Sequence, residues 1–496
     1  MKGDIVSVKI SELNLGQIDS RREYEKDRNY FIKSFVEPDS INMDTISNKQ
    51  NFIIIGKKGS GKTAVLLNKM DKMNSLGYAT SFVSFYDELT PEESRKFAQS
   101  KVFNFLEYSK ASSIVDQYDF REIWKSFIFR KIAQLSQEHC IDDDFTNFAN
   151  PSKSKIINFL HNIKKGLKVS ARVPAQYADI AAEYDFSKLE TDQDISVSAF
   201  NKICQDLLLE NANKYKVFII IDELVVSHFN TQSDEYMLKI ALIRDLIKTL
   251  SLINDTCCHN NFDVHIACNL RPEIRDLINS IDAEIGKIVD DSDTQIHWYS
   301  PEDQGEILFE IMKLKIITGH PEKDSFDIDS FIDESINIGG RDHSIPKFLS
   351  LNTWHKPRDV VRLLKSYQKK NPNHTRITED GIKNSLNEYA RASAKELLDE
   401  VSVWHEINTK NIQQCIRNKT YNDYESFSES IKSATLRSNI DEFCESLFIS
   451  GIIGNIDYTN NKPRYFWSHQ GEEYLDRSMG IRIHPALWNY FNIRHR

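Results

Sequence analysis

The chain has 496 residues, of which 40% are hydrophobic and 27% are charged, and its formal net charge is −10. That length exceeds what one hydrophobic core supports, so we expect about three domains. The negative charge argues against a protein that coats nucleic acid non-specifically, because such binding neutralises phosphates. The sequence has no long apolar run, no secretion signal and no zinc-ligand spacing among its seven cysteines. We therefore expect a cytoplasmic protein with reduced thiols and no membrane partner.

The first informative stretch is NFIIIGKKGSGKTAVLLNKM, residues 51–70. A short buried strand over 51–55 and a helix from Thr63 are expected, with a glycine loop between them. The loop matches GxxxxGK[ST], in which glycines let successive backbone N–H groups converge on phosphate oxygens at a helix N-terminus. Lys62 is expected to neutralise the β- and γ-phosphates, and Thr63 to place its hydroxyl on Mg²⁺. The predicted nucleotide-binding residues are Gly56, Lys57, Lys58, Gly59, Ser60, Gly61, Lys62, Thr63 and Ala64.

The same helix spells NKxD over Asn68–Asp71, a guanine-recognition motif. Its place in the helix beside the phosphate loop argues against that role, because guanine readers follow a later strand. A strand is then expected over 78–87, followed by a mostly helical insertion over about 90–205, with helices at 119–137 and 156–173. Part of the insertion is basic, which fits either an anionic partner or a solvated helix face. The basic residues are Lys153, Lys155, Lys164, Lys165, Lys168 and Arg172.

A second nucleotide element is predicted in KVFIIIDEL, residues 216–224. The apolar run predicts a buried strand of a parallel sheet, and its two terminal acids form a Walker B pattern. Asp222 would hold Mg²⁺ through water, and Glu223 would orient and deprotonate the attacking water. We expect this strand to lie next to the strand of the glycine loop. The alternative is a buried strand that merely ends in solvated carboxylates.

Residues 261–278, NFDVHIACNLRPEIRDLI, predict another strand and then a helix that begins at Pro272. Asn269 and Arg271 lie at the end of that strand, where polar groups would face the γ-phosphate. We favour Arg271 as the sensor, because a charge at this place distinguishes a triphosphate from a diphosphate. A strand-end cap without a ligand is the alternative. The preceding helix is expected to open with Ser233, Asp234 and Glu235, and the last core strand is expected over 295–300.

The remainder of the chain predicts a helical lid over 301–395 and a winged helix over 396–496. Ser300–Asp303 has the form of a capping box for the first lid helix. Arg358 falls on the first turn of a helix that begins at Pro357, where it would tie the lid to the phosphates. His355 is a second candidate, and a surface ion pair is the alternative. A helix over 436–449, strands in GIIGNIDYT and PRYFWSH, and a short helix in HPALWNYFNI form the predicted winged helix, which could contact DNA or pack against protein.

In this order, GKKGSGKT, FIIIDE, CNLRPE and WHKPRDVV resemble bacterial P-loop ATPases of the AAA+ and STAND type with a C-terminal winged helix. Many such proteins belong to mobile elements, anti-phage defence loci or DNA repair. The resemblance implies an α/β P-loop NTPase fold, with a lead segment at 1–48, a core at 49–300, a helical insertion, a lid and a winged helix. It also implies ATP and Mg²⁺ as cofactors. No arginine finger is assignable, and Arg275 is only a guess.

Two hypotheses about function follow. In the first, the chain is a switch ATPase in which Lys62, Arg271 and Arg358 hold core and lid around ATP. Hydrolysis through Glu223 then releases them, and the signal passes to a separate effector protein or through self-association. In the second, the chain is a DNA-engaging loader, remodeller or repair ATPase that uses the winged helix and the basic insertion.

Overall fold

The computed structural model describes residues 8–47, 49–84, 120–149, 168–171, 193–210, 214–224, 234–321, 326–338, 340–402, 405, 407–435, 439–459 and 462–493. Contacts between residues divide the chain into two compact units. The sheet unit comprises Ser40–Lys58 and Val65–Ile296. The lid unit comprises Met1–Asp39, Gly59–Ala64 and His297–Arg496, so it includes the second half of the glycine loop.

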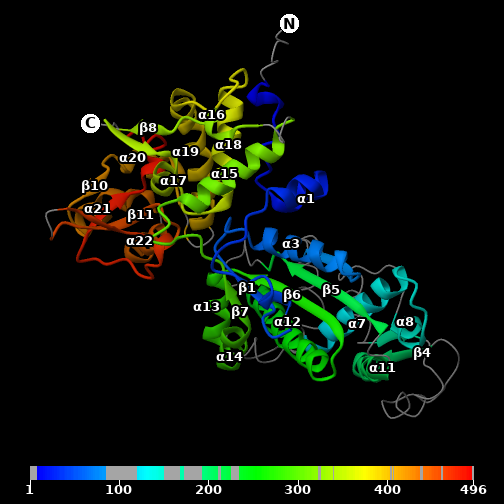
Figure 1. The fold of residues 1–496 in the computed structure, drawn as a ribbon. Helices are drawn as coiled ribbons and strands as arrows, with labels where there is room; N and C mark the ends of the chain where they lie inside the picture. The colour runs from blue at the N-terminus through cyan, green and yellow to red at the C-terminus, as the bar shows by residue number, and fades with distance from the viewer. Residues whose placement is uncertain are drawn as a thin grey trace, which may run out of the picture. The chain divides into compact units, whose positions relative to one another are not determined.

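A five-stranded parallel sheet forms the centre of the sheet unit, in the order β2-β5-β6-β1-β7 (Figure 1). Its inner strands are continuous apolar runs because helices cover a parallel sheet on both faces. Helices connect the successive strands, and of these helices α7 packs on β2 and β5 and α12 packs on β6. The elements are β1 Ile53–Ile55, α3 Lys62–Ser75, β2 Ala79–Ser84, α7 Arg121–Glu138, β5 Lys216–Asp222, α12 Asp234–His259, β6 Asp263–Leu270, α13 Pro272–Ile281, α14 Ala283–Ser292 and β7 Asp293–Gln295, with a 3-10 turn η2 at Thr45–Ser47.

This sheet confirms the predicted α/β P-loop class, and it corrects two details. The Walker B strand β5 is not adjacent to β1, because β6 pairs with both of them. The last strand, β7, covers 293–295 instead of 295–300, and pairing continues only through Ile296 N–H, which donates to Ile55 O at 2.8 Å. An edge strand of sequence DTQ has no apolar signal. The apolar residues that drew the prediction, such as Trp298, follow the strand.

The insertion in the sheet unit is helical in α7, α8 (Asp144–Ala149) and α11 (Val197–Glu210). The helix predicted over 156–173 is wrong at its end, because β3 (Lys168–Ala171) pairs antiparallel with β4 (Gln193–Ser196). This pairing sets Val169 opposite Ile195, and β-branched residues favour extended backbone. Of the basic residues predicted here, all but Lys168 lie outside the described part of the chain.

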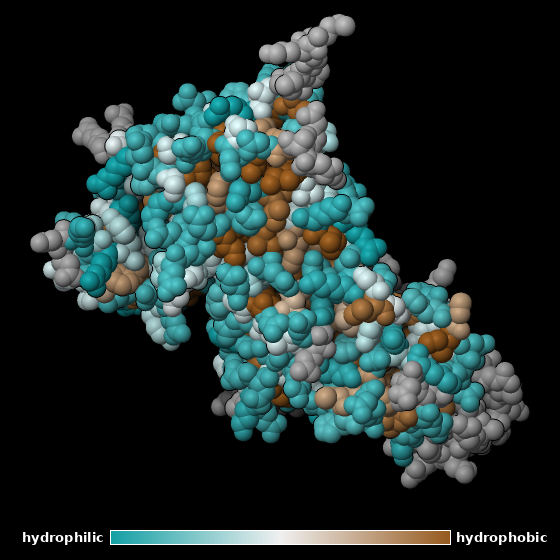
Figure 2. Space-filling view, in the orientation of Figure 1, coloured by the Kyte–Doolittle hydropathy of each residue, from teal (hydrophilic) through white to brown (hydrophobic). Residues whose placement is uncertain are grey.

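The N-terminal segment and the lid helices pack together in the lid unit. α15 contacts the N-terminal segment through Lys315. The Lys315 ammonium donates to the Glu23 carboxylate and, at 2.9 Å, to Ser34 Oγ. Figure 2 shows hydrophobic colour gathered over α15 on the viewed face. The elements are η1 Ile10–Glu12, α1 Ser20–Lys26, α2 Arg28–Lys33, α15 Glu306–Gly319, α16 Ile328–Phe331, β8 Ser335–Ile338, β9 Arg341–Ser344, α17 Ile345–Asn352, α18 Pro357–Lys370 and α19 Glu379–Val401.

The predicted capping box at Ser300–Asp303 is wrong, because α15 begins at Glu306. Gly305 is the N-cap residue, with φ 96°, and Asp303 supplies the capping carboxylate. Its oxygens accept from Gly305 N–H at 3.1 Å and from Ile307 N–H at 3.0 Å. The pattern places the N-cap at Ser300, so the observed cap lies five residues later, at a glycine in the left-handed conformation.

The last part of the lid unit confirms the winged helix. Three helices precede the strands β11, β12 and β13, and β10, which follows the first helix, completes a four-stranded sheet of order β10-β13-β11-β12. β11 and β12 form the antiparallel wing. The closing helix is only a 3-10 turn, η8 (Pro485–Leu487). The other elements are α20 Thr409–Cys415, β10 Thr420–Tyr421, α21 Tyr424–Ile431, η6 Lys432–Ala434, α22 Ile440–Ile449, β11 Ile453–Asp457, β12 Arg464–Phe466, η7 Ser468–Gln470 and β13 Gly480–Ile483.

The sequence predicts neither a membrane-spanning helix nor disulfide bonds. Among the helices that the structure describes, none carries an apolar stretch long enough to cross a bilayer. All seven cysteines are free thiols, three of which are buried in the sheet unit. Burial raises the pKa of the Cys268 thiol to about 12, so this thiol, next to Asn269 on β6, stays protonated.

Candidate functional site

The glycine loop connects β1 to α3 and starts at the carboxyl edge of the sheet. Gly56 N–H donates to Leu270 O at 3.3 Å, so the loop leaves β1 beside the end of β6. Gly59 and Gly61 have φ values of 84° and 89°, a left-handed conformation that favours glycine. The backbone path itself therefore requires glycine at positions 59 and 61.

Within the lid unit, three side chains cover the outer side of the loop. The Trp298 indole Nε1–H donates to Ser60 O at 2.7 Å, and Trp298 is 7% exposed. A Cβ atom at Gly61 would lie 3.7 Å from Pro357 Cγ and 3.8 Å from Trp298 Cζ2. A Cβ at Gly59 would lie 3.3 Å from Arg358 Cβ and Cδ. Trp298, Pro357 and Arg358 thus pack against the loop at Gly59, Ser60 and Gly61.

The predicted Walker B aspartate and sensor asparagine meet at the carboxyl edge of the sheet unit. Asp222 ends β5 and is 2% exposed, and Asn269 lies one residue before the end of β6. The Asn269 side-chain amide donates to Asp222 Oδ1, and Glu223 N–H donates to the same oxygen. These two donors fix the orientation of the carboxylate. The structure therefore brings together two residues 47 positions apart in the sequence.

Glu223 occupies a strained position at the same edge. Its φ of 63° is left-handed, which costs a residue with a Cβ roughly 1–2 kcal/mol. The Ser84 hydroxyl at the end of β2 donates to the Glu223 carboxylate. Such strain is frequent at functional sites, and Glu223 is exposed to solvent there.

Arg271, the favoured sensor, caps α13 without entering the Asp222 cluster. It is the N-cap residue before Pro272, and its Nη1 lies 3.6 Å from Glu273 Oε1. Arg275, the guess for an arginine finger, pairs with Asp276 at 2.9 Å. In the sheet unit, Asn269 is thus the polar strand-end residue that contacts Asp222.

Arg358 lies on the first turn of α18, as the sequence predicts, and belongs to a buried charge cluster. Its Nη1 donates to Glu396 Oε1 on α19 at 2.6 Å, and Arg362 donates to the other oxygen of the same carboxylate. Arg362 also contacts Asp359 Oδ1 at 3.3 Å. Desolvation lowers the pKa of Arg358 from its usual value, while Asp359 opposes the shift. The cluster holds the arginine beside Gly59.

His355, the second sensor candidate, is turned into the interior of the lid unit. Its ring lies 5.0 Å from that of Tyr299 and 5.7 Å from that of His469, and the residue is 4% exposed. Burial lowers the pKa of His355 to about 4, so the ring is neutral at pH 7. His484 stacks on Trp354 at 4.3 Å in the same ring cluster, and burial lowers its pKa to about 3.

The described residues suit Mg²⁺ that arrives with a nucleotide. They contain no group of three or more histidine, cysteine, aspartate or glutamate side chains arranged to hold a metal ion. Mg²⁺ keeps several waters and is bound through one or two carboxylates plus substrate phosphates, not by an all-protein cage. One buried, oriented aspartate such as Asp222 meets that requirement, and the Thr63 hydroxyl is the second predicted ligand.

Sequence reasoning missed three polar partners, Trp298, Glu396 and Ser84. Each contacts a predicted residue from far away in the chain, and no local motif includes any of them. Trp298 follows the last core strand, and its position directly after an edge strand is the only signal that the sequence offers.

Comparisons with known proteins found similarity to solved structures only. No protein-family model and no curated protein matches the chain. AMPPCP-bound DnaA from Aquifex aeolicus is 12% identical over 82% of this chain and 81% of that chain, with a TM-score of 0.30. The Aeropyrum pernix ORC2 protein, in ADPNP–ADP complexes, is 10% identical over 90% and 94%, with a TM-score of 0.36. CDC6P from Pyrobaculum aerophilum is 10% identical over 92% and 94%, with a TM-score of 0.30. TM-scores this low do not support a shared function, and the fold class follows from the sheet and the loop described above.

Proposed function

We propose that the chain binds and hydrolyses ATP and uses the nucleotide state as a conformational switch. The observation that carries the proposal is the carboxyl edge of the sheet. There, Asp222 and Asn269 are hydrogen-bonded to each other, and Gly56 starts the glycine loop against Leu270. A loop of this type, followed by a helix N-terminus, binds phosphate through backbone N–H groups and the helix dipole.

Each residue then has a defined part in hydrolysis. The loop amides and Lys62 bind the phosphate chain, and Thr63 and Asp222 hold Mg²⁺. Bound Mg²⁺ would neutralise charge that develops on the phosphate oxygens. Glu223 orients the attacking water and accepts its proton. Ser84 keeps the Glu223 carboxylate in place through its hydrogen bond.

The switch itself depends on residues that connect the nucleotide to the lid. Arg358 sits beside Gly59 and carries a charge that can pair with phosphate. Arg271 and Asn269 sense the γ-phosphate from the end of β6. In this proposal hydrolysis releases the lid and signals to a separate effector or to another copy of the chain. The sequence resemblance supports a cytoplasmic, bacterial role in anti-phage defence.

Binding and hydrolysis are tested separately by two substitutions. Lys62→Ala should abolish ATP binding in a titration, because the phosphates lose their main counter-ion, whereas Lys72→Ala, on the same helix, should bind normally. Glu223→Gln should keep ATP bound but slow turnover by about two orders of magnitude, through loss of general-base help. Unchanged ATP affinity in Lys62→Ala would refute the binding assignment, and wild-type turnover in Glu223→Gln would place the base elsewhere.

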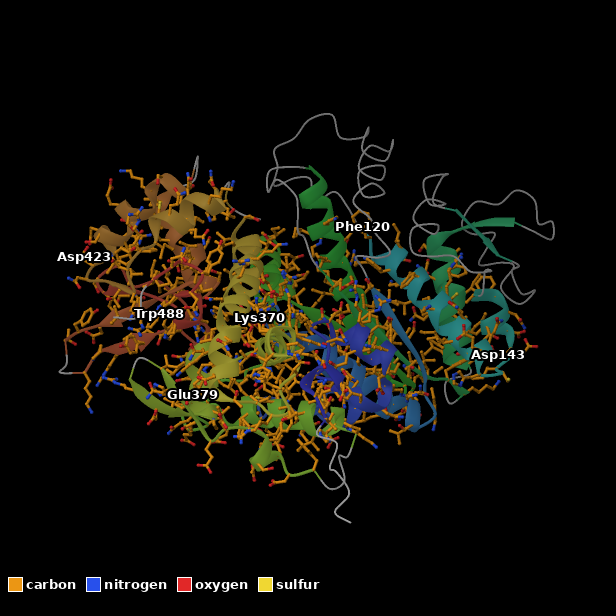
Figure 3. The ribbon with its side chains drawn as sticks, turned by 90° about the horizontal axis from the view of Figure 1, so that it is seen from above. Phe120, Asp143, Lys370, Glu379, Asp423 and Trp488 are labelled. Atoms are coloured by element: carbon orange, nitrogen blue, oxygen red, sulfur yellow. The ribbon has the colours of Figure 1, made fainter. Side chains whose placement is uncertain are left out.

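A second candidate function, a DNA-engaging ATPase, is favoured by one feature of the winged helix. The Arg482 guanidinium on β13 lies 4.2 Å from the Tyr465 ring centroid and 5.3 Å from that of Trp488, which Figure 3 labels. Lys419 Nζ lies 4.6 Å from the Trp488 centroid. Among the described residues, neither cation has a carboxylate within ion-pair distance. Unpaired cations beside aromatic rings suit a nucleic-acid backbone and its bases.

DNA and effector functions differ in how the ATPase responds to DNA. If DNA engagement is the function, duplex or single-stranded DNA should stimulate hydrolysis, and rising salt should remove the stimulation. Arg482→Ala should reduce the stimulation, whereas Lys432→Ala, which removes an exposed cation paired with Glu429, should not. An ATPase indifferent to DNA at low salt would leave the effector switch as the function.

A further inference from the structure

The indole of Trp298 contacts the backbone of the glycine loop. Its Nε1–H donates to Ser60 O at 2.7 Å, across 238 positions of sequence. Trp298 is 7% exposed, so this bond is shielded from water and is not readily replaced by a solvent contact.

A hydrogen bond to a carbonyl oxygen also fixes the peptide N–H that follows it. The peptide between Ser60 and Gly61 is trans, as no cis bond occurs among the described residues. In a trans peptide the C=O and N–H point in opposite directions across one rigid plane. Trp298 holds Ser60 O on the packed side of the loop. Gly61 N–H therefore points to the opposite side, where a phosphate would lie.

The packing around Gly61 supports the same orientation. With φ 89°, Gly61 has few steric limits of its own, so its peptide planes would rotate freely without an external contact. A Cβ at this position would touch both Trp298 Cζ2 and Pro357 Cγ, at 3.8 and 3.7 Å. The two rings close the outer side of the loop, and the indole N–H supplies the directional contact there.

The Ser60 hydroxyl is a second buried polar group of the loop. Its Oγ is fully enclosed and has no hydrogen-bond partner among the described residues, although the residue is only 4% exposed. A buried hydroxyl without a partner costs free energy unless a ligand or water satisfies it. Among the described residues, Ser60 thus has a hydrogen-bond partner for its carbonyl, through Trp298, but none for its hydroxyl.

We propose that Trp298 is a positioning residue for nucleotide binding, which orients the Ser60–Gly61 peptide so that Gly61 N–H meets the phosphate chain. The proposal rests on the proposed ATP binding at this loop. It adds a residue outside the GxxxxGK[ST] motif to the determinants of phosphate affinity. The benefit is pre-organisation, because the peptide is oriented by the protein and does not lose rotational freedom when the phosphate binds.

The test replaces the indole N–H and keeps an aromatic ring. Trp298→Phe should bind ATP and ADP about tenfold more weakly in a titration with a fluorescent nucleotide. In steady-state kinetics, KM for ATP should rise by a larger factor than kcat falls. Trp124→Phe is the matched control, because Trp124 is also buried and its Nε1–H donates to a backbone carbonyl, Leu242 O, at 3.0 Å. Both variants should lose similar thermal stability, but Trp124→Phe should bind nucleotide as the wild type does.

The outcomes separate this proposal from the one on which it rests. If the wild type binds ATP and Trp298→Phe binds it equally tightly, the positioning role is wrong. If the wild type itself does not bind ATP, the proposed function fails instead. Should Trp298→Phe not fold, 3-benzothienylalanine at position 298 makes the same test, because it keeps the indole shape with sulfur in place of N–H. Equal affinity with that residue also overturns the proposal.

Discussion

Glu396→Gln should destabilise the lid unit, because the Glu396 carboxylate is the acceptor that Arg358 and Arg362 share. The carboxylate accepts from Arg358 with one oxygen and from Arg362 with the other. Glutamine keeps one oxygen but presents an NH₂ group in place of the second. One of the two guanidiniums would then face a donor instead of an acceptor, with no change in side-chain volume.

The magnitude follows from how deeply the cluster is buried. The Arg362 side chain is 8% exposed and that of Glu396 17% exposed. Breaking a buried ion pair by removing one partner costs about 3–5 kcal/mol. Arg362 keeps Asp359 at 3.3 Å, so we expect a cost just below that range, about 2–3 kcal/mol. For a unit of this size that corresponds to a fall in Tm of roughly 5–10 °C.

Differential scanning calorimetry measures this fall directly. Glu388→Gln is the matched control on the same helix, because Glu388 pairs with Lys369, whose side chain is 67% exposed. An exposed pair contributes about 0.2–1 kcal/mol, so this variant should shift Tm by no more than about 3 °C. Equal shifts in the two variants would refute the claim that burial of the cluster sets its contribution.

Three further predictions concern the loop, the sheet edge and pH. Gly59→Ala should weaken ATP binding at least tenfold in a titration, because its φ is 84° and a Cβ would press on Arg358. Gly77 has the same φ but open space around it, so Gly77→Ala should lower stability without changing ATP affinity. Asn269→Ala should slow hydrolysis more than it weakens ATP binding, since the Walker B aspartate loses its orienting amide; equal effects on both in steady-state kinetics would contradict this role. His355 and His484 have pKa values of about 4 and about 3 in the folded protein, and both take up protons more readily in the unfolded chain. Their contribution to the free energy of unfolding is therefore fully present above about pH 6.5, and it is lost as the pH falls toward these folded-state pKa values. Chemical denaturation should show a loss of about 4 kcal/mol between pH 7 and 5, and a flat free energy of unfolding over that window would contradict it.

Local patterns in the sequence predicted most of the strands and helices that carry the site. NFIII, KVFIIID and DVHIACNL are each apolar runs of strand length, and the structure has strands there. The predictions failed where the pattern was short or polar. β7 is DTQ, and the cap of α15 depends on the left-handed conformation of Gly305. Neither feature is encoded by hydrophobic periodicity.

The sequence by itself determined the glycine loop, the strand that leads into it and the acids at the end of β5, because backbone conformation and burial at these places depend on neighbouring residues. Tertiary structure alone decided that β6 separates β5 from β1, that Asn269 orients Asp222, and that Trp298 binds the loop backbone. These contacts join residues tens to hundreds of positions apart. They arise from how strands and helices pack in three dimensions, which no spacing along the chain specifies.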